Sequence, residues 1–346
     1  VAGVADGYWQ AEQAVRVLDV TFSATDADTL SQEDLVGQFR AAMDAGKTKS
    51  DVNTGNVRKA ADAAARVFEA EYTVPFLAHA AMEPLNATAW VHDGKLELWS
   101  GLQNPLAVRN ELAGELGFKT DDVIIHNTML GGGFGRRAMP DYPMMAARIA
   151  QDAGVPVKMI WSREEATQQA WYRPAVVSRF RAGLDDDGLP VSWENLYVHK
   201  HDPPEASQIP YGSKNQTIEY AESEHHVRFG PWRSVDHTQH GFFIESFIDE
   251  LATEASADPY EYRRTLVADK PRYVAVLDAA AKAAGWGRDL PEGHGLGIAL
   301  TDSFGTVVAQ VAEVDATGPV PRVAHVWAAA DPGYVMNPDG FIALIE

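Results

Sequence analysis

The chain has 346 residues, enough for two domains and a sizeable buried core. It carries 29 Lys and Arg against 49 Asp and Glu, a formal net charge of −20, which makes nucleic acid or an anionic membrane surface a poor candidate partner. It contains no cysteine, which excludes disulfides, cysteine-bound iron–sulfur clusters and structural cysteine–zinc sites, and no apolar run approaches the roughly 20 residues that a membrane helix needs.

The N-terminal part predicts strands and then a helix. Residues 1–6 lack the basic start and the long apolar segment of a signal peptide, and we expect them to be the middle of a strand in a chain cut from something longer. Residues 15–22 alternate apolar and polar side chains, which predicts another strand. In residues 57–72 the apolar side chains recur at a helical spacing, which predicts a helix.

The middle part predicts helices and strands in turn. Asn104 and Pro105 are a typical N-cap and first position of a helix, which we expect to end at Gly117. Residues 123–125 predict a short strand and residues 143–150 a helix. A further strand is expected over residues 155–162, and the acidic run at residues 185–188 predicts a hairpin turn.

The C-terminal part predicts three helices followed by strands. An apolar stripe over residues 244–255 marks the first helix, and the prolines at positions 259 and 271 begin the other two. From Gly295 the pattern turns to strands, with a hairpin turn at residues 315–318. The whole chain therefore predicts an α+β fold with no internal repeats.

The glycine loop, residues 130–137, is the most informative motif. Four glycines allow left-handed backbone conformations and close approach of a ligand, and the loop ends in Arg136 and Arg137. Free N–H groups beside two guanidinium groups suit an anion such as a phosphate. The alternative is an ordinary glycine-rich turn with solvated arginines.

The same loop also fits a dinucleotide-binding fingerprint. Residues 133–138 match G-x-G-x-x-G/A between a predicted strand and helix, and Glu164 stands roughly where an acidic ribose ligand would lie. Against this, more than a hundred residues precede the loop, and Pro140 and Pro143 would delay the helix that should cradle the pyrophosphate. A dinucleotide-binding oxidoreductase is therefore the weaker alternative.

Further motifs accompany the glycine loop along the chain. They are residues 79–89, 230–235, 245–252, 258–259, 311–314 and 331–338. Together with the glycine loop, their order and spacing resemble the large, molybdenum-cofactor-binding subunit of the xanthine dehydrogenase/aldehyde oxidase superfamily, and within it the isoquinoline 1-oxidoreductase beta-subunit branch. The resemblance covers nearly the whole chain.

The resemblance implies a domain organisation. Residues 1–56 would be the tail of a preceding α/β-hammerhead-like domain, and residues 57–290 the first molybdenum-cofactor-binding domain. Residues 291–346 would begin a second such domain. The chain would then be truncated at both ends, with mixed sheets and packed helices in the part that remains.

The resemblance also implies a cofactor and its contacts. The cofactor would be molybdenum–molybdopterin in its cytosine dinucleotide form; because its dithiolene sulfurs hold the metal, the protein supplies no metal ligand. Gln103 matches a residue beside the metal's oxo group, where a carboxamide can donate a hydrogen bond, and Arg233 matches one on the substrate side. Alternatively Gln103 caps the following helix and Arg233 forms a salt bridge. The cofactor cradle would comprise Gly132, Gly133, Phe134, Gly135 and Arg136, with the Gly135 N–H facing an oxygen ligand.

The implied reaction is hydroxylation of an aldehyde or N-heterocycle with oxygen from water. Ala138 and Met139 stand where purine-oxidising members carry an acidic residue, which argues against a purine. Electrons would leave through a small iron–sulfur subunit. The family's catalytic glutamate lies beyond this chain, and Glu346 does not match it, so we expect the isolated chain to be inactive.

Two further expectations concern Glu83 and the role of the whole chain. We expect Glu83 to hold buried backbone N–H groups rather than to act in catalysis. A non-catalytic binding or assembly module that holds no cofactor is the alternative function. The chain leaves the compartment open, with the bacterial periplasm favoured over the cytoplasm.

Overall fold

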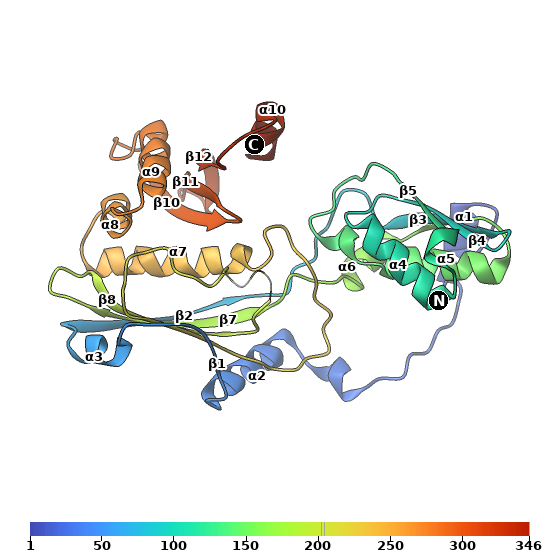
Figure 1. Cartoon of the computed structure of the whole chain (residues 1–346), viewed down its shortest axis with the longest axis horizontal. Helices are drawn as coiled ribbons and strands as arrows, with labels where there is room; N and C mark the ends of the chain where they lie inside the picture. Colours follow the sequence, from blue (N-terminus) through green and yellow to red (C-terminus); the bar gives the residue numbers. More distant parts are fainter. Residues whose placement is uncertain (202, 204, 346) are drawn as a thin grey trace. The chain divides into compact units, whose positions relative to one another are not determined.

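The computed structural model describes residues 1–201, 203 and 205–345, which fold into two compact units (Figure 1). The first unit comprises Val1–Leu35, Pro75–Ala175 and Glu224–Arg233, and the second comprises Val36–Val74, Val176–Ser223 and Ser234–Glu346. Each unit is thus assembled from three separate stretches of chain. The predicted domain boundaries at residues 56 and 290 concern family domains rather than these units and stay predictions.

The first unit is built on a four-stranded sheet in the order β5-β4-β3-β6. Strands β3 and β4 form an antiparallel hairpin whose turn residues, Asp93 and Gly94, both have positive φ, as a two-residue hairpin turn demands. Strand β5 lies parallel to β4, and β6 lies antiparallel to β3. The strands are β3 (Asn86–His92), β4 (Lys95–Ser100), β5 (Val123–Asn127) and β6 (Val157–Ile160).

Two helices pack on this sheet, as the sequence predicts. Helix α4 (Pro105–Leu116) begins at the N-cap Asn104, whose Oδ1 accepts from the Ala107 N–H at 3.3 Å, and it ends at left-handed Gly117. Helix α5 (Asp141–Ala153) buries one face, and its Tyr142 is fully enclosed. The unit's core joins both helices to the strands through Leu96, Leu98, Val108, Leu112, Tyr142 and Ala146. The shorter helices are α1 (Tyr8–Arg16) and α6 (Arg163–Gln168).

This topology shows that the dinucleotide-binding interpretation is wrong. In that fold the strand before the glycine loop and the strand after the following helix are parallel members of one βαβ unit. Here those strands are β5 and β6, which lie at opposite edges of the sheet. Helix α5 also begins only after Pro140, so its N-terminus does not lie in the glycine loop.

The second unit contains a five-stranded sheet in the order β1-β9-β8-β7-β2, with helix α7 (His237–Glu254) along one face and α3 (Val57–Asp62) against the other (Figure 1). The predicted hairpin turn at residues 185–188 joins β7 to β8. The strands are β1 (Lys49–Thr54), β2 (Arg66–Val74), β7 (Val176–Leu184), β8 (Pro190–Val198) and β9 (Gln216–Ala221).

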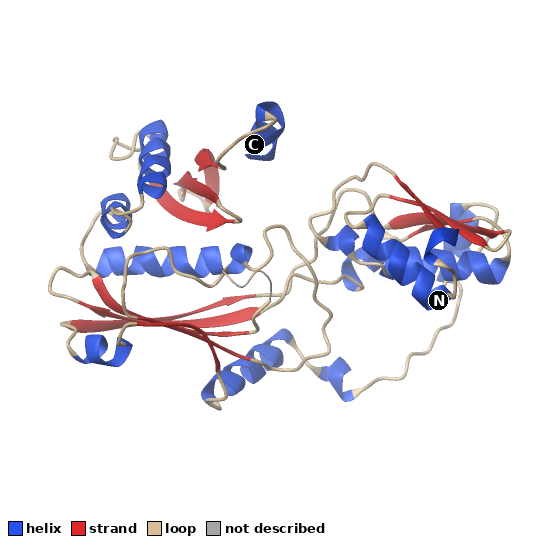
Figure 2. Ribbon diagram, viewed as in Figure 1, coloured by secondary structure: helices blue, strands red, loops and turns tan. Residues whose placement is uncertain are grey.

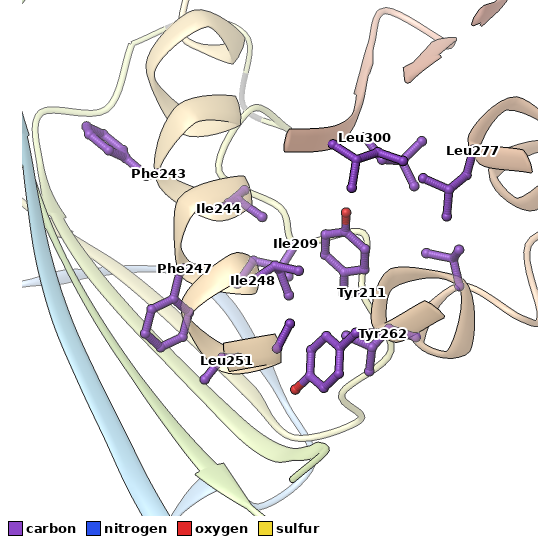
Figure 3. Packing of buried hydrophobic residues seen from close by; sticks show 14 of the residues in the cluster. Ile209, Tyr211, Phe243, Ile244, Phe247, Ile248, Leu251, Tyr262, Leu277 and Leu300 are labelled. Carbon is purple, nitrogen blue, oxygen red and sulfur yellow. The ribbon is translucent and has the colours of Figure 1, made fainter. Parts of the chain in front are cut away.

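The core of the second unit is centred on α7. Phe247 faces the sheet, whereas Ile244 and Ile248 meet Tyr211 and Leu300 on the other side (Figure 3). Two more helices and a three-stranded antiparallel sheet, β10-β11-β12, complete this core (Figure 2). They are α8 (Pro259–Leu266), α9 (Pro271–Ala284), β10 (His294–Ser303), β11 (Thr306–Asp315) and β12 (Arg322–Asp331); α2 (Gln32–Asp44) and α10 (Pro338–Ile345) are the remaining helices of the described residues.

The α+β class is confirmed, and so are the three C-terminal helices and the strands after Gly295. Three predicted elements are wrong. Residues 1–6, which we expected to be the middle of a strand, form no strand and pair with none. Residues 15–22 are not a strand, because no neighbouring strand pairs with them and side chains such as Val17 and Phe22 stay more than 80% exposed. The helix predicted over residues 57–72 ends at Asp62, and β2 then pairs with β7 over its whole length. Within the described residues, none of the helices has the length and apolar character to cross a membrane.

Candidate cofactor site

The glycine loop connects β5 to α5 in the first unit and has an irregular backbone. Gly132 and Gly135 have φ of 99° and 101°, values that other residues rarely adopt. Phe134 between them has φ of 54° and keeps 42% of its side chain exposed. A non-glycine residue in this conformation is uncommon and persists only where the surroundings fix it. Three groups of contacts supply that constraint.

The first group comes from Glu83, just before β3. Its Oε2 accepts from the Gly131 N–H at 2.7 Å, and its own N–H donates to the Gly131 carbonyl at 3.1 Å. Its Oε1 accepts from Asn86 Nδ2 at 2.8 Å. Burial opposes ionisation of this carboxyl, but the Gly131 and Asn86 hydrogen bonds and the charge of Arg137 together lower the pKa of Glu83. Glu83 thus holds one backbone N–H, that of the exposed Gly131, and that it has no catalytic role stays a prediction.

The second group comes from the two arginines, which point inward. Arg137 is 1% exposed and donates to the Glu83 carboxylate at 2.9 Å and to the Gly132 carbonyl at 3.0 Å. Arg136 is 3% exposed and forms a bidentate pair with Asp141 at 2.6 and 2.8 Å. The expectation that both guanidinium groups stand open to an anion is therefore wrong. Arg136 as a cofactor-binding residue stays a prediction.

The third group comes from Gln103. Its Oε1 accepts from the Gly135 N–H at 2.9 Å and from the Arg137 N–H at 3.2 Å. Asn104 caps α4, so Gln103 does not. The Gly135 N–H, which we expected to face an oxygen ligand, has a protein acceptor instead. Because Oε1 accepts from two donors, the NH₂ of Gln103 faces away from them, and no described protein group accepts from it.

The segment that carries Gln103 is itself fixed. Tyr142 on α5 donates to the Gly101 carbonyl at 3.0 Å, and Asn127 at the end of β5 exchanges two hydrogen bonds with the backbone of Leu102. The Gln103 N–H donates to the Arg137 carbonyl at 3.0 Å. Gln103 is therefore anchored from the sheet, from α5 and from the loop it supports.

The loop leaves a row of donors open. The N–H groups of Gly132, Gly133 and Phe134 are consecutive, and no group in the described part of the chain accepts from them. Gly133 is buried and Gly132 half-buried, while the side chain of Phe134 is exposed. With the Gln103 carboxamide they form a set of uncharged donors. Such a set suits a ligand rich in oxygen or nitrogen acceptors.

The segment Gly230–Arg233 lies against the loop. A Cβ placed on Gly135 would lie 2.1 Å from the Pro231 carbonyl oxygen, so only glycine fits there. Arg233 follows two residues later and is exposed. The structure thus brings the segment of the predicted substrate-side residue beside the loop. It gives no arrangement of three or more His, Asp or Glu side chains suited to a metal ion within the described residues.

Sequence reasoning missed two residues of this site. Asp141, which neutralises Arg136, lies five residues after it in the chain. The sequence marked Asp141 only as an acidic residue near the start of a predicted helix. His79 opens one of the quoted motifs, yet its hydrogen bond to Pro231 at 2.8 Å joins residues 152 positions apart. No local pattern reveals such a contact.

Comparisons with known proteins show what the chain is similar to. A family model described as "Molybdopterin cofactor-binding domain" matches residues 42–202. The chain is 31% identical over 293 residues to isoquinoline 1-oxidoreductase subunit beta of Brevundimonas diminuta, covering 77% of this chain and 37% of the relative. It is 29% identical over 230 residues to the xanthine dehydrogenase molybdenum-binding subunit of Escherichia coli O157:H7, covering 62% and 31%.

A solved structure has the same fold. Quinoline 2-oxidoreductase from Pseudomonas putida 86 superimposes with a TM-score of 0.70 at 20% identity, covering 88% of this chain and 44% of that one. The chain spans less than half the length of each of these relatives. The resemblance inferred from the motifs is confirmed: residues 42–202 match a molybdopterin cofactor-binding domain, and the chain is similar to molybdenum-binding subunits of the xanthine dehydrogenase/aldehyde oxidase superfamily.

Proposed function

We propose that this chain is the cofactor-cradling part of an oxidoreductase that hydroxylates an aldehyde or an N-heterocycle. The observation that carries the proposal is the row of three consecutive open N–H groups at Gly132, Gly133 and Phe134, next to the Gln103 carboxamide. This row lies inside the region that matches the molybdopterin-binding family.

The residues present fit such a cofactor. A pterin with its phosphate offers many acceptors, and the loop offers backbone donors that need no side-chain reorganisation. The glycines that let the backbone approach a ligand are locked by Glu83, Gln103 and Pro231. We further propose the cytosine dinucleotide form of the cofactor. When bound, the cofactor supplies the redox chemistry that inserts a water-derived oxygen into an electron-poor carbon.

The chain's own residues bind the cofactor and orient the substrate. The Gln103 NH₂ donates to an acceptor of the bound cofactor without adding charge, and its Oε1 keeps the loop in place. Arg233 faces the substrate and stabilises negative charge on it. The exposed ring of Phe134 lies next to the open donors and limits the access of water to them. Ala138 and Met139 leave no carboxylate for a purine, which favours a neutral substrate.

Several features of the whole protein belong to this proposal. Electrons leave through a small iron–sulfur subunit, because the chain has no cysteine for a cluster of its own. The catalytic glutamate lies outside this chain, so the isolated chain does not turn over. Glu346, to which we gave no role, lies outside the described residues. We expect the natural protein in the bacterial periplasm.

The substitution Gln103→Glu tests the central role of the carboxamide. Glutamate keeps an oxygen for the Gly135 and Arg137 N–H groups but removes the NH₂ donor. In the natural protein with its partner, we expect kcat/KM for aldehydes and N-heterocycles to fall by about 10- to 100-fold, the cost of one hydrogen bond to a charged or developing-charge group. A separate measurement tests the reaction itself: when the unmodified protein reacts in ¹⁸O-labelled water, the hydroxylated product should contain ¹⁸O.

The matched control is Gln151→Glu, which makes the same chemical change on the exposed surface of α5. We expect it to keep the kcat/KM of the unmodified protein. If Q103E and Q151E turn over equally fast, the donor role of Gln103 is wrong. Product oxygen that comes from O₂ rather than from water would contradict the reaction itself.

A further inference from the structure

Trp232, the residue before Arg233, contacts two side chains of the same unit. The ring of His79 lies 4.5 Å from the Trp232 ring, centroid to centroid, at an interplanar angle of 37°. The guanidinium of Arg173 lies 6.0 Å from the Trp232 ring centroid, within cation–π range. The position of Trp232 therefore depends on residues from two other segments of the chain.

His79 also fixes the residue before Trp232. Its Nε2 lies 2.8 Å from the Pro231 carbonyl oxygen. That oxygen is the atom against which Gly135 packs, since a Cβ on Gly135 would lie 2.1 Å from it. One carbonyl thus receives a hydrogen bond from His79 and contacts the glycine loop. A shift of His79 would release the segment that the loop leans on.

The geometry determines the form of the imidazole. A carbonyl oxygen only accepts, so the proton of a neutral His79 is on Nε2. Nδ1 is buried and has no hydrogen-bond partner among the described residues, so a second proton would be left unpaired. Burial lowers the pKa of His79; the bond to Pro231 opposes this change, and the charge of Arg136 reinforces it.

Arg173 is the second side chain in contact with the Trp232 ring. Its backbone exchanges two hydrogen bonds with Leu77, at 2.9 and 3.2 Å, and its Nη2 donates to the Pro75 carbonyl at 2.8 Å. It forms no ion pair with any carboxylate in the described part of the chain. Its backbone and one guanidinium nitrogen are therefore held by other backbone groups, with the guanidinium within cation–π range of Trp232.

We propose that His79 is a positioning residue, whose neutral, Nε2-protonated imidazole binds the Pro231 carbonyl and packs against Trp232, and so holds the Trp232–Arg233 peptide beside the glycine loop. This inference rests on the proposed function of that loop and of Arg233. It names the residue through which the segment of Arg233 is attached to the site. His79 contacts neither substrate nor cofactor in this account.

Two substitutions separate the hydrogen bond from the ring. His79→Gln keeps an N–H donor at nearly the same distance from the backbone and loses the ring, whereas His79→Phe keeps the ring and loses the donor. In the natural protein we expect H79F to lower kcat/KM about tenfold, mainly by raising KM, because Arg233 loses its position. We expect H79Q to recover most of that loss.

The control is His92→Phe, since His92 is a stacked histidine of the same unit, 3.7 Å from the Trp90 ring and at the far end of β3 from Glu83. We expect H92F to keep the kinetics of the unmodified protein. Equal kcat/KM for H79F and the unmodified protein would overturn the proposal, and so would an H79Q as impaired as H79F.

A second readout does not depend on the cofactor. Gly230 donates its N–H to the Tyr172 carbonyl at 3.0 Å, so hydrogen exchange of residues 229–233 reports the attachment of this segment. We expect faster exchange in H79F and unchanged exchange in H79Q and H92F. In ¹⁵N-histidine-labelled protein, the resonance lost in H79F should have the shifts of a neutral Nε2–H tautomer. Unchanged exchange in H79F, or a charged or Nδ1–H His79 at pH 7, would overturn the inference even if the cofactor binds as proposed.

Discussion

Each unit of the molecule contains a buried arginine paired with a carboxylate that also accepts from a backbone N–H. In the second unit, Arg263 on α8 donates to Glu245 on α7 at 2.9 Å, and the same carboxylate oxygen accepts from the Leu300 N–H at 2.7 Å. In the first unit, Arg137 donates to Glu83 at 2.9 Å, and the same oxygen accepts from the Gly131 N–H at 2.7 Å. The two networks therefore have the same kinds of donor, a guanidinium and a backbone N–H, at the same distances from one carboxylate oxygen.

They differ in what they hold and in how far they are shielded from water. The Glu245 side chain is 7% exposed, and its network ties α7, α8 and strand β10 into one core. The Glu83 side chain is 37% exposed, and its network holds an irregular loop whose other face is open. The same arrangement therefore ties a core together where it is enclosed, and fixes the shape of the glycine loop where water reaches one side.

The largest expected effect is that of Arg263→Met in the second unit. It leaves the enclosed Glu245 carboxylate without its cation, and removing one partner of a buried ion pair costs about 3–5 kcal/mol of unfolding free energy. Urea unfolding of the variant and of the unmodified protein measures the difference. A loss below about 1 kcal/mol would contradict the view that this network is essential to the core.

A smaller effect is expected for Glu83→Gln in the first unit. The amide keeps an acceptor for Gly131, and water reaches this side chain, so we expect a loss of about 1 kcal/mol. Cofactor content should fall more clearly than stability, because the loop loses its fixed shape. The control is Glu111→Gln on the exposed surface of α4, which should change neither quantity.

The effect of Glu83→Gln should also depend on pH. The pKa of Glu83 is lower in the folded protein, so its ionised form stabilises the fold above the unfolded value of 4.5, and this contribution is lost as the pH falls through the folded value. Thermal unfolding at pH 7 and at pH 4 and below should show the Tm difference shrinking on acidification. A difference that grows on acidification would reverse the assigned direction.

The parts of the fold that are determined locally could be predicted from the sequence. Asn104, Pro105 and Gly117 bound α4 because capping and left-handed termination involve only neighbouring residues. The strand predicted over residues 15–22 failed because a strand also needs a partner, which a local alternation of side chains does not reveal. Likewise, Phe68 and Tyr72 alternate inward on β2 once β7 pairs with it.

The site shows the same limit. The motifs singled out Gln103 and the open glycines. They did not predict that Gln103 accepts a hydrogen bond from the Gly135 N–H. The arginines were predicted to face an anion, and their burial depends on Asp141 and Glu83, which the fold brings beside them. The type of residue could thus be predicted, whereas the group that each one contacts is set by tertiary structure.

The most direct test of the account is cofactor content in Gly135→Ala. A Cβ at this position would overlap the Pro231 carbonyl at 2.1 Å, in a backbone conformation with φ of 101°. Gly114→Ala, in α4 with no atom within 4 Å of the added carbon, is the matched control. Molybdenum and oxidised pterin should be stoichiometric in the unmodified natural protein and in G114A, and severely reduced in G135A. Equal content in G135A, or none in the unmodified protein, would contradict a glycine loop that cradles molybdopterin.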